Sequence, residues 1–97
     1  MSLDLSRPLG ISRHADFKSR AHGDVLVLPE QAIRVGGSGA EILRLVTEGH
    51  CAGSILRTMR TRYRDSSEIE SEVLGFLERM LSLGGIVCLD EPLEKTR

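Results

Sequence analysis

The side chains of this chain that could do chemistry are three histidines, two cysteines and a cluster of glutamates. His50 and Cys51 are adjacent and would point to different sides of a helix start, which does not suit shared coordination of one metal ion. His14, His22 and Cys88 have no metal-ligand spacing to each other or to that pair. No CxxC spacing occurs, so we expect two ordinary free thiols and no metal site.

Two further motifs argue against catalysis. Glu68, Glu70 and Glu72 are two residues apart, so on a helix they fan around the axis and do not converge as a catalytic pair. The GGSG run at 36–39 is too short and wrongly flanked for dinucleotide binding, and it suits a hinge between a strand and a helix. We therefore predict a protein that is not an enzyme and that has no catalytic residue and no cofactor.

Composition limits the class of protein. A chain of 97 residues corresponds to one domain, and 40% hydrophobic but only 3% aromatic residues predict an aliphatic core. The net charge of −1 favours neither nucleic acid nor an anionic membrane as a partner. No apolar run approaches the length of a membrane span, and the N-terminus lacks the apolar segment of a signal peptide. We therefore predict a cytoplasmic protein with no membrane contact.

Three short strands are predicted before the first helix. Val25–Leu28 is a β-branched and apolar run that ends at Pro29, which cannot donate a hydrogen bond to a sheet. Ala32–Val35 returns as a strand whose side chains alternate between two faces. His14–Arg20, built around Phe17, is a weaker strand candidate.

Two helices are predicted to follow. Ser38 and Glu41 match a capping box for a helix that ends at Gly49. A second helix over His50–Tyr63 has one apolar face. Four arginines fall mostly on its remaining surface: Arg57, Arg60, Arg62 and Arg64. Two interpretations of this run stay open, a solvated helix face and a docking patch for an acidic partner.

A third helix begins after Asp65, where Ser67 and Glu70 form a second capping-box match. At about 100° per residue its core-facing stripe contains Ile69, Val73, Phe76, Leu77, Met80 and Leu83. Leu74 and Leu81 lie beside that stripe and widen the apolar face beyond what a surface helix needs. Gly84-Gly85 ends the helix, and a short extended segment follows.

This order of elements predicts an α+β, winged helix-turn-helix-like fold. Three short N-terminal strands precede three helices and a short C-terminal extended segment. The domain is expected to cover residues 14–89, with a flexible N-terminal arm over residues 1–13 and a flexible C-terminal tail over residues 90–97.

From the LVLPE hairpin at 26–30 onward, the sequence resembles the PqqD family, small accessory proteins of pyrroloquinoline quinone (PQQ) biosynthesis. The resemblance covers Phe17 to Val87. It continues through AEILRLV with Glu48-Gly49, then Ile55 and Tyr63, and last EVLGFL with Gly84. This chain departs from the family at Gly36-Gly37-Ser38, where relatives often carry leucine-asparagine, and at Glu48, where aspartate is common. Related peptide-recognition domains of other peptide-modifying enzymes share the pattern, so another modified peptide stays open.

The resemblance implies a peptide chaperone with a winged helix-turn-helix domain. Such a protein binds the precursor peptide PqqA and presents it to the radical SAM enzyme PqqE. Carried over residue by residue, it implies an edge strand of Ala32, Ile33, Arg34 and Val35. It also implies a helix surface near Leu74, Glu78 and Leu81. The residue pattern agrees, because a short strand with free backbone groups beside a helix with a wide apolar stripe suits strand addition.

Two other classes of protein stay open. A winged-helix DNA-binding regulator would read DNA with the third helix, yet Asp65–Leu83 carries five acids against Arg79 alone, a local charge of about −4 and the wrong sign for phosphates. A structural or dimerisation module is the other class, since an exposed leucine pair could form a homodimer surface.

Overall fold

Strands and helices occur in blocks along the chain, and the predicted α+β class is confirmed. The computed structural model describes residues 5–20 and 23–89. In order, the elements are β1 (Leu9–Ile11), β2 (Asp16–Arg20), β3 (Gly23–Val27), β4 (Ala32–Val35), α1 (Ser38–Thr47), α2 (Ala52–Arg62), α3 (Ile69–Leu83) and β5 (Ile86–Cys88). One more strand precedes the first helix than the three predicted, and β5 is the predicted C-terminal extended segment.

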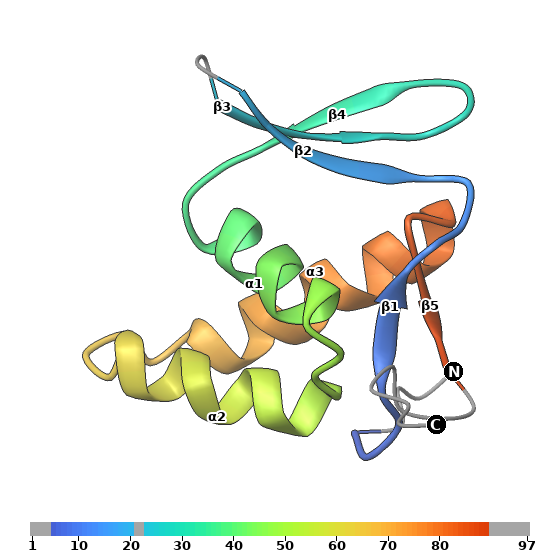
Figure 1. Ribbon diagram of the computed structural model, residues 1–97. Helices are drawn as coiled ribbons and strands as arrows, with labels where there is room; N and C mark the ends of the chain where they lie inside the picture. Colours follow the sequence, from blue (N-terminus) through green and yellow to red (C-terminus); the bar gives the residue numbers. More distant parts are fainter. Residues whose placement is uncertain (1–4, 21–22, 90–97) are drawn as a thin grey trace.

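The described strands form two small antiparallel sheets. β2, β3 and β4 pair in sequence order, whereas β1 pairs with β5 from the other end of the chain. Figure 1 shows the three-stranded sheet as a layer above the helices, with α1 beneath it and α2 at the bottom. β1 and β5 stand at the right-hand end of the helices in that view.

The sequence predicted a flexible arm over residues 1–13, but part of this segment belongs to the fold. Leu9 is fully buried, its N–H donates to the His50 carbonyl at 3.2 Å, and β1 is hydrogen-bonded to β5. The Leu5 carbonyl accepts a hydrogen bond of 2.8 Å from the Gly53 N–H, in the first turn of α2. A free N–H of that turn is thus capped by backbone from the N-terminal segment. Residues 1–4 and the expected tail 90–97 lie outside the described residues.

Neither predicted capping box forms. No side chain caps α1, which follows Gly37, or α3, which follows Glu68. Each glutamate of the two boxes has a partner in another helix instead: Glu41 accepts from Arg62 at 3.0 Å, and Glu70 pairs with Arg60 at 2.9 Å. Tertiary ion pairs therefore replace the local caps.

The glycine ends of two helices agree with prediction. Gly49 follows Glu48, the C-cap residue of α1, and has φ +90°. Gly84 is the C-cap residue of α3 and has φ +82°. A positive φ strains residues with a Cβ, so glycine suits both positions.

The core lies between the helices and the facing sides of the strands, and it is aliphatic as composition predicted. The largest fully buried side chains are Leu9, Leu26, Ile42, Leu43, Ile55, Met59, Leu77, Met80, Ile86, Val46 and Val73. Full burial of a side chain of this size contributes about 1.5–3 kcal/mol. On α3 the predicted stripe is only partly correct, because Leu83 is 42% exposed and Phe76 is half-buried.

Cys51 and Cys88 are unbonded and half-buried. Among the described residues, no group of histidine, cysteine or carboxylate side chains could hold a metal ion. Within the same ranges, no helix has the length and apolar character to cross a membrane.

Candidate functional site

β4 is an edge strand, as the sequence analysis predicted. It pairs with β3 on one side, and no other described strand pairs along its second side. Two residues alone separate Leu28 from Gln31 in the hairpin, and the Leu28 N–H donates to the Gln31 carbonyl at 2.7 Å. That bond fixes which residues of β4 face β3 and which face the open edge.

Hydrogen-bonded and non-hydrogen-bonded pairs alternate along an antiparallel ladder. Counting from the bonded pair at Leu28 and Gln31, the pair Leu26–Ile33 is bonded, whereas Val25–Arg34 is not. The N–H and C=O groups of Arg34, and by the same count those of Ala32, therefore point to the open edge. This edge offers two donors and two acceptors in the spacing that an added strand requires.

The side chains of β4 alternate as predicted. Val35 is buried and Ile33 packs against the core, whereas Ala32 and Arg34 are exposed. A strand added beside β4 would therefore have one face toward the helices and one toward solvent.

The predicted helix contacts lie on the flank of α3 that faces α2. On α3, Leu74 and Leu81 are half-buried and pack against the core, and Glu78 is exposed. At about 100° per residue, both leucines share a flank with Glu70. Glu70 pairs with Arg60 of α2, so this flank faces α2. The grouping of Leu74, Glu78 and Leu81 with β4 stays a prediction that this geometry does not favour.

Phe76 lies on the opposite flank of the buried stripe, where the chain passes from β4 into α1. A Cβ built on Gly39 would come within 3.2 Å of the Phe76 ring, so the ring lies against the first turn of α1. Leu83, seven residues later, shares this flank. The helical periodicity predicted both in the core stripe, and only their position at its edge could have indicated a surface role.

The sequence matches the family model described as "Coenzyme PQQ synthesis protein D (PqqD)" over residues 23–86, which is more than half of the 97 residues. The chain belongs to the PqqD family. The match runs from β3 to the first residue of β5, so it contains β4 and α3 but not β1 or β2. Membership in the PqqD family implies a role in PQQ biosynthesis, in which PqqD proteins are non-catalytic accessory proteins. Neither the curated proteins nor the solved structures gave a match.

The arginine run of this PqqD-family chain divides into two kinds. Arg60 and Arg62 are engaged by Glu70 and Glu41, respectively. Arg57 and Arg64 are exposed and have no ion pair with any carboxylate of the described chain. Two of the four arginines thus carry charges that no described carboxylate pairs with, and the docking role of the run stays a prediction.

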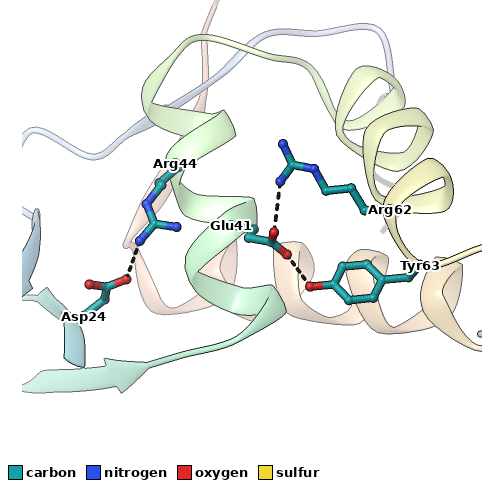
Figure 2. Close-up of polar contacts among 5 residues, drawn as sticks. All are labelled: Asp24, Glu41, Arg44, Arg62 and Tyr63. Atoms are coloured by element: carbon teal, nitrogen blue, oxygen red, sulfur yellow. Dashed lines mark hydrogen bonds and ion pairs between the residues drawn. The ribbon is translucent and has the colours of Figure 1, made fainter. Parts of the chain in front are cut away.

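Figure 2 shows the polar contacts that link α1 to its neighbours. The Tyr63 hydroxyl donates to Glu41, which also accepts from Arg62, so one carboxylate ties the end of α2 to α1. The hydrogen bond to Glu41 is the main cause that raises the pKa of Tyr63 above its ordinary value, and desolvation is the second. On the other side of α1, Arg44 donates to Asp24 of β3 at 2.9 Å.

Proposed function

We propose that this PqqD-family protein is a peptide chaperone that binds the precursor peptide PqqA and presents it to the radical SAM enzyme PqqE. The observation that carries the proposal is the open edge of β4, whose free backbone groups belong to Ala32 and Arg34. The order of strands and three helices supports a winged helix-turn-helix-like arrangement of the domain. A cytoplasmic location would accord with this role.

The peptide would add as a strand beside β4 and place alternate side chains toward the helices. Backbone pairing would supply affinity with little dependence on sequence, and an apolar surface below would favour apolar peptide residues. Phe76 is the better candidate for that surface, because it lies against Gly39 directly after the hinge that follows β4. Leu74 and Leu81 are the alternative surface, on the flank that faces α2.

The experiment is a titration of isotope-labelled protein with synthetic PqqA, followed by NMR, for the wild type and three alanine variants. We expect the largest shifts at the Ala32 and Arg34 amides. Phe76→Ala should weaken binding by about tenfold, because full burial of one large apolar side chain contributes about 1.5–3 kcal/mol. Leu74→Ala tests the alternative surface, on the flank of α3 that faces α2.

Leu77→Ala is the control for folding, because Leu77 is fully buried and its truncation should lower the melting temperature. If Leu74→Ala weakens binding and Phe76→Ala does not, the peptide lies on the flank that faces α2. If PqqA leaves the amides of β4 unshifted, strand addition at this edge is wrong.

We further propose that Arg57 and Arg64 help this protein to dock on an acidic surface of PqqE. Arg57→Glu should slow association at low ionic strength and have little effect at high salt, since exposed charges act mainly on the association rate. Arg57 is a cleaner target than Arg60, whose replacement would also break the pair with Glu70. Unchanged association of Arg57→Glu at low salt would remove this docking surface.

DNA binding is the weaker alternative for this domain. The side chains of Glu72 and Glu78 are exposed on α3, so the helix that would enter the groove presents negative charge to phosphates. A homodimer remains an expectation, to be tested by sedimentation at increasing protein concentration.

A further inference from the structure

Two adjacent glycines, Gly36 and Gly37, connect the three-stranded sheet to α1 along the chain. A Cβ built on Gly36 or Gly37 would meet no atom within 4 Å, so no side chain packs against either residue, although their carbonyls accept hydrogen bonds from the Gly39 and Glu41 N–H groups at 3.1 and 3.4 Å. Gly37 adopts φ +56° and ψ −130°, a conformation that suits glycine. By itself this connection would let the sheet change its angle to the helices.

A salt bridge spans the same gap. Asp24 of β3 lies opposite Val35, the last residue of β4 before the glycines. Its carboxylate accepts from the Arg44 guanidinium of α1 at 2.9 Å, and the Asp24 side chain is only 15% exposed. The sheet end, the glycines, α1 and this salt bridge thus form a closed ring, of which Figure 2 shows the bond between Arg44 and Asp24.

Other contacts between this sheet and the helices are apolar. The Leu26 side chain lies against Gly85, at the end of α3, where an added Cβ would come within 2.7 Å of it. Among the side chains of this sheet that the structure describes, Asp24 alone is hydrogen-bonded to a helix, through Arg44. Leu26 and Val35 hold the sheet on the helices by apolar packing, which has no preferred direction, so the Asp24–Arg44 bond is the directional contact that sets its angle.

We propose that Arg44 is a positioning residue for peptide binding, because its bond to Asp24 fixes the angle between the β4 edge and α3. This inference rests on the proposed function. An added peptide must pair with β4 and contact α3 at the same time, so only a narrow range of sheet angles admits it. When the binding-competent angle is populated for only a fraction of the time, the apparent dissociation constant rises by the inverse of that fraction.

The test measures the affinity for synthetic PqqA of Arg44→Ala by calorimetry, together with its melting temperature. If loss of the bond leaves the competent angle populated about one-fifth of the time, the dissociation constant rises about fivefold. The melting temperature should fall by only a few degrees, since ion pairs with an exposed partner contribute little to stability. The charge-exchanged double variant Asp24→Arg/Arg44→Asp should recover part of the affinity.

A second variant separates positioning from direct contact with the peptide. Alanine fits at Gly36, whose φ is not positive and whose surroundings are open, and it narrows the angles open to the hinge. Gly36→Ala in the Arg44→Ala background should therefore restore part of the affinity. If Arg44 touched the peptide directly, this second substitution would restore none.

The matched control is Arg60→Ala. Arg60–Glu70 is also a 2.9 Å salt bridge, and its arginine is as exposed as Arg44, but it joins α2 to α3 away from the glycines. Arg60→Ala should bind PqqA as the wild type does. Equal weakening by Arg60→Ala, or wild-type affinity of Arg44→Ala, would overturn the positioning role. Failure of the wild-type protein itself to bind PqqA would instead refute the proposed function, and this inference with it.

Discussion

Arg34→Pro is expected to weaken the binding of PqqA by more than tenfold while the domain stays folded. The Arg34 N–H faces the open edge of β4, so proline removes a donor that an added strand needs without removing a bond to β3. The proline ring would also occupy space at the edge where the peptide backbone must approach. Titration calorimetry gives the affinity, and the melting temperature reports on the fold.

Arg34→Ala is the control for this variant, because it removes the charged side chain but keeps the N–H group. It should bind PqqA within a few-fold of the wild type. Equal loss in both variants would mean that the arginine side chain, and not the strand edge, recognises the peptide. Wild-type affinity of Arg34→Pro would exclude strand addition at β4.

Leu9→Ala is expected to lower stability by about 2–5 kcal/mol, the range for deleting a buried leucine side chain. Leu9 is fully buried between β5 and the helices, although it precedes the part of the chain that matches the family. For a domain of this size, such a loss lowers the melting temperature by about 8 °C or more.

Leu5→Ala is the matched control, because Leu5 belongs to the same N-terminal segment but is 44% exposed. Its carbonyl would still cap α2, so the melting temperature should change little. If Leu9→Ala melts like the wild type, β1 adds little to the fold, and the expectation of a flexible arm was closer to the truth.

Local signals were sufficient for the elements at the centre of the chain. The alternation of side chains over Ala32–Val35 predicted β4 and its two faces. Gly49 and Gly84 correctly indicated the ends of two helices. β1 was not predicted, because a strand of three residues is too short to show an alternation of apolar and polar side chains. Its partner β5 lies at the other end of the sequence, so nothing near Leu9 indicates that it is buried.

The candidate site could be only half predicted, for a similar reason. The stripe of α3 shows which residues are apolar, but it does not show which flank lies toward the sheet. That choice depends on the neighbours of the helix, as the contact of Phe76 with Gly39 and the pair of Glu70 with Arg60 demonstrate. The Asp24–Arg44 bond has no local signal in the sequence, since its partners are twenty positions apart.

The pairing of β1 with β5 also has a consequence for biosynthesis. The chain leaves the ribosome from its N-terminus, so Leu9 emerges first and must wait for Ile86–Cys88 before its partner strand exists. The hairpins of β2, β3 and β4 join near neighbours and can close earlier, because contacts between distant residues form more slowly. We expect truncated nascent chains that end before Ile86 to keep β1 accessible to protease, and protection to appear only once β5 has been released.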